Sequence, residues 1–117
     1  MSLPVPERDI GRLRDMLDHA LIAQAHAEGL DEAGFHASRL HQDAVIRVLA
    51  IIGEAANALS EETRAAHPDI PWRSIIGMRH RLVHDYAGVT PAVIWTTVQD
   101  RLPILIGLLR AILPPPE

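Results

Sequence analysis

The stretch that decides the fold is LHQDAVIRVLAIIGEAANAL, residues 40–59. Its apolar residues recur at steps of three and four, which places them on one side of an α-helix. They are Leu40, Ala44, Val48, Ile51, Ala55 and Leu59, and the stripe is broadened by Val45, Ile46, Leu49 and Ile52. Between residues 44 and 59 the only charged residues are Arg47 and Glu54. The pattern predicts a central, mostly buried helix around which the rest of the chain packs.

Helical signals also flank this segment. Apolar residues with the same period predict an earlier helix over about residues 10–25, with Gly29 as its stop. Residues 30–38 break the pattern. After the central helix, Ser60 is expected to cap a short helical extension that Pro68 ends.

Two more helices are expected in the second half of the chain. Asp69 is expected to cap one that reaches about Tyr86, and Thr90 with Pro91 begins the last one. Pro103 is expected to kink this last helix. Since no alternating strand pattern appears, the sequence predicts an all-α fold, an antiparallel bundle of four to five helices.

The end of the last helix is apolar nearly all round. A helix of this kind needs cover on more than one side, so residues 104–113 are expected to form the interface of a homodimer. With 117 residues, 48% of them hydrophobic, the chain has room for one domain. We therefore expect a single helical domain over residues 1–113, followed by a disordered proline-rich tail over residues 114–117.

Composition excludes several classes of protein. The chain has no cysteine, which rules out a disulfide scaffold, a thiol nucleophile and a cysteine-type zinc site. It has no lysine and no glycine-rich phosphate loop, so a Walker-type nucleotide site is absent. The apolar stretch over residues 102–113 is shorter than the roughly 20 residues that cross a bilayer, and the N-terminus lacks a secretion signal. A cytoplasmic location without a membrane partner is the expectation.

Charge is unevenly distributed. The formal net charge is −4, yet residues 64–86 carry four arginines against two aspartates, a local +2 that leaves −6 elsewhere. These residues are Arg64, Arg73, Arg79, Arg81, Asp69 and Asp85. The sequence thus allows one basic patch on an acidic body, which suits a local contact with nucleic acid better than broad binding.

The densest polar cluster is RHRLVHDY, residues 79–86. Its two arginines, two histidines and tyrosine could supply phosphate clamps, a group for proton transfer near neutral pH and a phenol. The alternative is a solvated helix end, at which arginine and histidine favour the helix dipole. Both interpretations stay open on composition alone.

Glu54 is a carboxylate in an apolar helix and is costly there unless it has a partner. Arg79 is the candidate partner, and the alternative is a side chain that points to solvent. His80 and His84, four residues apart, could form a metal-binding pair with Asp85. No third ligand is evident and the flanking arginines would repel a cation, so no metal is expected.

The remaining histidines are expected to be solvated. His36 and His41 form a loose cluster with Asp43, and His19, His26 and His67 are expected at the surface. With only four aromatic residues, a base-stacking platform for single-stranded nucleic acid is not expected.

From about Asp43 to Leu113 the order of motifs closely resembles the HepT-like branch of the HEPN superfamily. The matching motifs are Gly53-Glu54-Ala55-Ala56, then residues 67–72 (HPDIPW), then Gly77-Met78-Arg79 through His84-x-Tyr86, then Trp95 and Leu102-Pro103. The most specific element is R-x4-H-x-Y, here Arg79, His84 and Tyr86. The position after the motif arginine is often asparagine in this branch and is His80 here.

The resemblance implies an all-helical homodimer whose two R-x4-H motifs meet at the interface. It implies a metal-independent endoribonuclease without a cofactor, the toxin of a toxin–antitoxin pair. The antitoxin would be a minimal nucleotidyltransferase of the MNT type, which can transfer AMP to Tyr86.

The residue types of the motif suit metal-free cleavage of RNA. Metal-free RNA cleavage needs a base, an acid and cations for the charge on phosphorus. In a two-fold dimer, His84 from each chain would serve as acid and base, and both copies of Arg79 would clamp the phosphate. His80 and Arg81 would steer the RNA backbone, and Glu54 would hold Arg79.

Two other functions remain open at this point. The chain could be a catalytically silent HEPN module that binds RNA or a nucleotidyltransferase partner. It could also be a metal-dependent hydrolase that uses His80 and His84.

Overall fold

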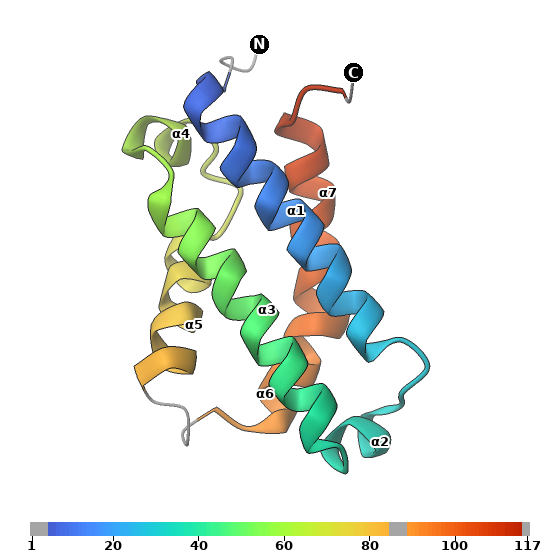
Figure 1. Ribbon diagram of the computed structural model, residues 1–117. Helices are drawn as coiled ribbons and strands as arrows, with labels where there is room; N and C mark the ends of the chain where they lie inside the picture. The colour runs from blue at the N-terminus through green and yellow to red at the C-terminus, as the bar shows by residue number, and fades with distance from the viewer. Residues whose placement is uncertain (1–4, 85–88, 116–117) are drawn as a thin grey trace.

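Two long helices form the centre of the molecule. The computed structural model describes residues 5–84 and 89–115, and over these residues all regular structure is helical. α1 (Glu7–Ala27) and α3 (Arg39–Ala58) lie side by side along the bundle (Figure 1). The predicted all-α fold is confirmed, and the central stretch is a single helix as expected.

The second half of the chain covers this pair from two sides. α5 (Trp72–His84) packs on α3, whereas α6 (Pro91–Thr96), the π-helical turn η2 (Thr97–Arg101) and α7 (Leu102–Ile112) form a continuous rod that contacts α1 (Figure 1). The rod is long and apolar enough to cross a membrane by length and composition. Its buried side chains nevertheless belong to the core of the bundle; they are Ile94, Val98, Leu102, Leu105, Ile106 and Leu109.

Burial along the rod bears on the dimer interface that the sequence predicts. The apolar residues after Pro103 are covered largely within one chain, because Leu105, Ile106 and Leu109 are buried in the core. Ile104 is the large side chain of this segment that stays exposed, at 65%. One chain thus buries part of this segment, and a homodimer interface over residues 104–113 stays a prediction.

Proline explains the π-helical turn before α7. Pro103 has no N–H to give to the carbonyl four residues earlier, and its ring would clash with that carbonyl in a regular helix. The widened turn η2 lies at this place and absorbs the disruption that the sequence predicts.

Short helices close the ends of the bundle. α2 (Glu32–His36), within a segment that breaks the helical pattern, places the buried ring of Phe35 5.4 Å from the ring of Trp95. α4 (Glu61–Ala66) follows Ser60, whose hydroxyl accepts a hydrogen bond from the Thr63 amide, as predicted for a cap.

Helix boundaries follow the predicted caps with one exception. Gly29 ends α1 with a φ of +82°, and the hydroxyl of Thr90 accepts from the amide of Val93 at the start of α6. α5 begins at Trp72, so the residue before it is Pro71, and the expected cap by Asp69 is wrong.

A buried carboxylate ties α4 to the start of α1. Asp9 is 1% exposed and accepts hydrogen bonds from the Ser60 hydroxyl at 2.6 Å and from the Thr63 hydroxyl at 2.5 Å. The Ser60 amide adds a third bond at 3.3 Å. Burial alone would raise the pKa of Asp9, but these bonds and the nearby Arg8 charge together hold the pKa below its ordinary value. The network fixes this end of the bundle.

Candidate functional site

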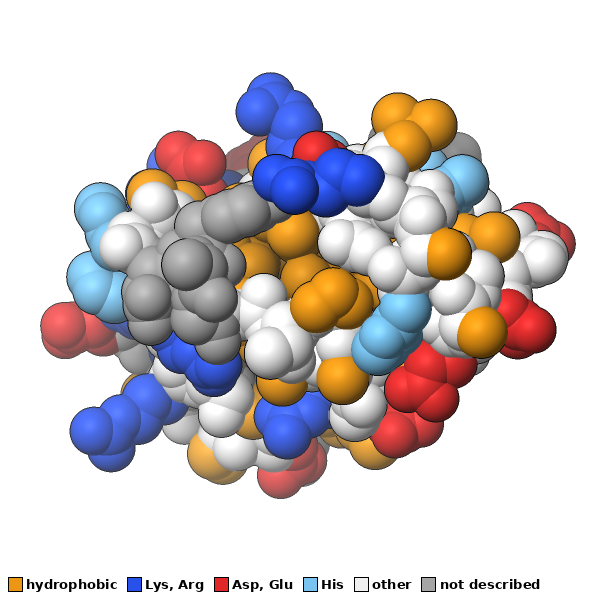
Figure 2. Space-filling model, turned by 90° about the horizontal axis from the view of Figure 1, so that it is seen from below, with side chains coloured by type: hydrophobic (Ala, Val, Ile, Leu, Met, Phe, Trp, Pro, Cys, Tyr) orange, Lys and Arg blue, Asp and Glu red, His pale blue; other side chains and the backbone are white. Residues whose placement is uncertain are grey.

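The polar cluster lies at the C-terminal end of α5. Arg79 is half-buried, whereas His80, Arg81 and His84 are exposed. Figure 2 looks onto the end of the molecule at which α5 stops, and histidine and arginine side chains project there around an apolar hollow. The motif is therefore open to solvent at this end of the bundle.

Gly53 of α3 determines how Arg79 is placed. A Cβ atom added to Gly53 would collide with Cβ of Arg79 and would come within 3.0 Å of the Ile75 carbonyl oxygen. The absence of a side chain thus lets α5 lie directly on α3 and fixes the backbone at Arg79. In the sequence, Gly53 stands out only as part of the motif Gly53-Glu54-Ala55-Ala56. A glycine inside an otherwise strong helix, at a cost of about 1 kcal/mol relative to alanine, was the available signal.

The two histidines lie on one face of α5, as their spacing predicts. The ring centroids of His80 and His84 are 4.6 Å apart, with an angle of 46° between the ring planes. Within residues 5–84 and 89–115, no group of three or more metal-binding side chains gathers, at this pair or elsewhere. The pair presents two imidazoles to solvent side by side.

Glu54 does not have the predicted role within one chain. Its side chain is exposed, and in the described part of the molecule no ion pair joins it to Arg79. Glu54 instead lines a groove of about 460 Å³ on the outer face of α3, together with Arg47 and the exposed Val83 of α5. We refer to this groove, floored by Ile46, Ala50 and Ile51, as the α3–α5 groove.

Arg81 points away from that groove. It lines a different hollow, between α5, α6 and η2, with Arg101 among the other residues that form it. The structure thus places Arg79 and Arg81 on two sides of α5, with the two histidines between them on the exposed side.

Some predicted residues do not join the site. Tyr86 and Asp85 lie outside the described residues. His67, expected at the surface, is buried, and its carbonyl accepts a hydrogen bond of 2.9 Å from the indole of Trp72. The expectation for His67 was wrong because the turn before α5 folds inward to receive Trp72.

Relatives of the chain are named as ribonucleases. The chain is 47% identical over 66 residues to a protein of Thermococcus cleftensis named as a probable ribonuclease HepT. The aligned residues are 56% of this chain and 60% of the relative. Over 70 residues it is 43% identical to a candidate RNase of Caldanaerobacter subterraneus subsp. tengcongensis, covering 60% and 62% of the two chains. The match thus spans about three fifths of the length of both relatives.

A longer match extends over most of the chain. A candidate RNase of Methanocaldococcus jannaschii is 33% identical over 100 residues, which are 85% of this chain and 86% of the relative. No solved structure matches at the level of significance of these relatives. The model of the family "Ribonuclease HepT-like" matches residues 8–112. The chain therefore belongs to the HepT-like ribonuclease family.

Proposed function

We propose that this protein is a metal-independent endoribonuclease, the toxin of a toxin–antitoxin pair. The observation that carries the proposal is the open end of α5, where the half-buried Arg79 and the exposed His84 lie within two turns of one helix. Membership of the HepT-like family and the RNase names of its relatives support RNA as the substrate.

The proposed reaction needs no group beyond those that two copies of the motif carry. One imidazole takes the proton of the ribose 2′-hydroxyl, and the 2′-oxygen attacks phosphorus as the bond to the 5′-oxygen breaks. A second imidazole, protonated, gives its proton to that leaving oxygen. Guanidinium groups of Arg79 stabilise the charge on the phosphoryl oxygens. The products are a 2′,3′-cyclic phosphate and a free 5′-hydroxyl.

Two copies of the chain would complete the site. Each motif holds one His84, and a two-fold axis beside it would bring both copies and both Arg79 side chains to one cleft. The α3–α5 groove supports this interface, since it runs beside the motif and is lined by the Val83 side chain, which is 51% exposed. Arg47 and Glu54 carry opposite charges on this face, so Arg47 of one protomer can face Glu54 of its partner.

Regulation is proposed to act through Tyr86. It is the only tyrosine of the chain, so a nucleotidyltransferase antitoxin that modifies tyrosine has one target. Attached AMP would bring a negative charge and a bulky group close to His84 in sequence and so oppose RNA binding. Incubation with a cognate MNT-type enzyme, ATP and magnesium should add AMP to the wild type and not to Tyr86→Phe.

Purified protein incubated with defined RNAs in EDTA tests the proposed reaction. Cleavage should persist in EDTA and leave a cyclic phosphate, because no metal-activated water takes part. Loss of cleavage on chelation would support a metal-dependent hydrolase that uses His80 and His84. RNA binding without cleavage would support the catalytically silent module.

Light scattering tests the composite site. We expect twice the chain mass at micromolar concentration, and Val83→Glu should shift the protein to a folded monomer that no longer cleaves RNA. A wild-type monomer that cleaves RNA at full rate would overturn the two-chain site.

A further inference from the structure

A second concave surface with two arginines lies beside the motif. The hollow between α5, α6 and η2 has a volume of about 280 Å³, and Arg81, Arg101, Met78 and Thr96 are among the residues that line it. Arg81 comes from α5, and Arg101 from the last position of η2. We call this hollow the Arg81–Arg101 hollow.

No acidic side chain pairs with either of these two cations in the described part of the chain. In the described part of the chain, the ion pairs join Glu32 to His36 and Asp43 to Arg39, and none reaches Arg81 or Arg101. Two guanidinium groups that share one concavity repel each other unless an anion lies between them. The hollow thus offers a site for a group that carries negative charge and several acceptor oxygens, such as a phosphate.

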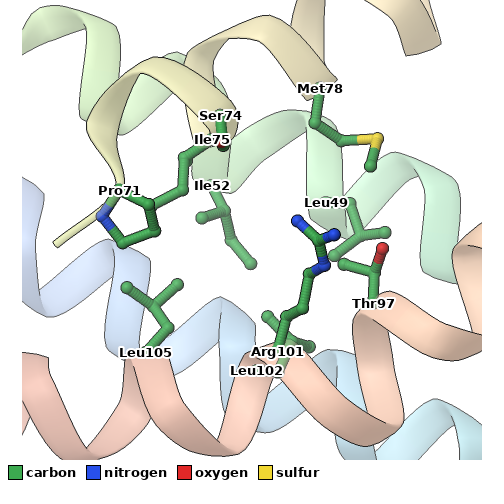
Figure 3. A pocket seen from close by; sticks show the side chains of 10 residues that line it. All are labelled: Leu49, Ile52, Pro71, Ser74, Ile75, Met78, Thr97, Arg101, Leu102 and Leu105. Carbon is green, nitrogen blue, oxygen red and sulfur yellow. The ribbon is translucent and has the colours of Figure 1, made fainter.

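Arg101 reaches the hollow because of the π-helical turn and an apolar support. Figure 3 shows its side chain extending from the rod toward Met78 of α5, at a small apolar cavity of about 80 Å³ lined by Leu49, Ile52 and Leu105. The aliphatic stem can lie against this apolar surface while the guanidinium stays in contact with water. Without the extra residue of the π-helical turn, Arg101 would lie about 100° further round the helix axis and would not face the hollow.

The hollow lies next to the proposed cleavage site. Arg81 and His84 are three residues apart on α5, a spacing that brings Cβ atoms within about 5–6 Å on a helix. RNA presents a phosphate at every nucleotide, so a chain with one phosphate at His84 has another within reach of the hollow. The hydroxyl of Thr96 adds a donor there, whereas that of Thr97 is already bonded to the Val93 carbonyl at 2.8 Å.

We propose that the Arg81–Arg101 hollow binds the RNA phosphate that neighbours the one being cleaved. The inference rests on the proposed ribonuclease function and adds a substrate-binding site to it. The site recognises the backbone and not the base, so it raises affinity for RNA of any sequence. A substrate that carries only the scissile phosphate cannot use it.

Substrate length separates this site from the reaction centre. We would compare a dinucleotide that has only the scissile phosphate with the same dinucleotide carrying one more phosphate at its 5′ or its 3′ end. In the wild type, one of the two additions should lower KM about tenfold. In Arg101→Gln that gain should vanish, whereas Arg110→Gln, an exposed arginine on α7, should keep it. An equal gain in Arg101→Gln and wild type would overturn the proposal.

Binding to an uncleavable RNA keeps this proposal distinct from the proposed function. On an oligoribonucleotide with a 2′-O-methyl group at every position, Arg101→Gln should reduce the slope of log affinity against log salt by about one. If no RNA is cleaved but this reduction is seen, the ribonuclease proposal fails and the phosphate site stands. If inorganic phosphate or AMP binds through Arg101 while the extra RNA phosphate gives no gain, the site belongs to a free anion and the proposal is wrong.

Discussion

The two ends of the bundle differ in whether their polar side chains are buried or exposed. At one end, Asp9 is buried and accepts hydrogen bonds from Ser60 and Thr63. At the other end, His80, Arg81 and His84 are exposed at the close of α5, and no ion pair holds them in the described part of the chain. Polar groups that bond to one another inside the protein stabilise it, whereas exposed groups that only water contacts are free to meet a ligand.

Substitutions at the two ends should therefore affect different properties of the protein. Changes at the α5 end should remove RNA cleavage and leave the free energy of unfolding nearly unchanged. Changes at the Asp9 end should do the reverse. Gly53 is the position where the two properties meet, because it lies in the core and also sets the place of Arg79.

Arg79→Ala should lower RNA cleavage by about 1000-fold, because the guanidinium is proposed to stabilise charge on the phosphoryl oxygens. Arg79→Lys should restore part of the rate, since it keeps the charge but not the two-pronged geometry. Single-turnover kinetics on a defined RNA measure both. Cleavage by Arg79→Ala at the wild-type rate would remove Arg79 from the reaction.

Gly53→Ala should lower both properties, with cleavage falling about 100-fold and the free energy of unfolding by about 2 kcal/mol. The new methyl group would meet the backbone of α5 at the Ile75 carbonyl, so the helices must separate and Arg79 must shift. Gly11→Ala is the matched control, since a Cβ there meets nothing within 4 Å, and it should stabilise α1 by about 0.5–1 kcal/mol. Denaturant titrations and cleavage assays on both variants measure these effects. If Gly53→Ala behaves like Gly11→Ala, neither folding nor cleavage needs the close approach of α5 to α3 at Gly53.

Asp9→Asn should lower the free energy of unfolding by about 2 kcal/mol at neutral pH and leave cleavage unchanged, because it removes charge-assisted hydrogen bonds at the far end. The native pKa of Asp9 lies below its ordinary value of 3.8, so its contribution is present above about pH 4 and is lost as pH falls through the native pKa. Urea titrations at several pH values should show the variant and wild type converging in acid. Asp18→Asn, an exposed aspartate of α1, should show no such convergence.

Glu54→Ala should have the smallest effect, less than about 0.5 kcal/mol on the unfolding of one protomer, because the side chain is exposed and unpaired with Arg79. Its effect should appear in the dimer dissociation constant if it faces Arg47 of the partner. Sedimentation at a series of concentrations measures this. A large loss of protomer stability would restore the buried pairing that the sequence predicted.

Local signals in the sequence predicted most of the fold. The period of apolar residues gave α1 and α3 their place, and the hydroxyls of Ser60 and Thr90 cap the helices expected of them. α2 has five residues, too few to show a helical period. The cap assigned to Asp69 failed because the helix begins three residues later, at Trp72, directly after Pro71.

The candidate site was predictable in composition but not in arrangement. The polar cluster over residues 79–86 is evident in the sequence, and the resemblance to the HepT-like branch singled out Arg79 and His84 within it. Contacts between distant segments decide the rest of the arrangement. They decide on which side of α5 each side chain lies, that Glu54 is exposed, and that Arg81 and Arg101 line the same hollow. Asp9 was missed for the same reason, because an acid in a first helical turn usually points to solvent.

His84→Ala tests the separation of the two ends most directly, when RNA cleavage and thermal unfolding are measured on the same preparation. We expect no cleavage above background in EDTA and an unfolding temperature within about 2 °C of the wild type, because the exposed imidazole contributes little to packing. Cleavage at the wild-type rate, or a loss of cleavage that follows a fall in unfolding temperature, would contradict the separation of the two ends.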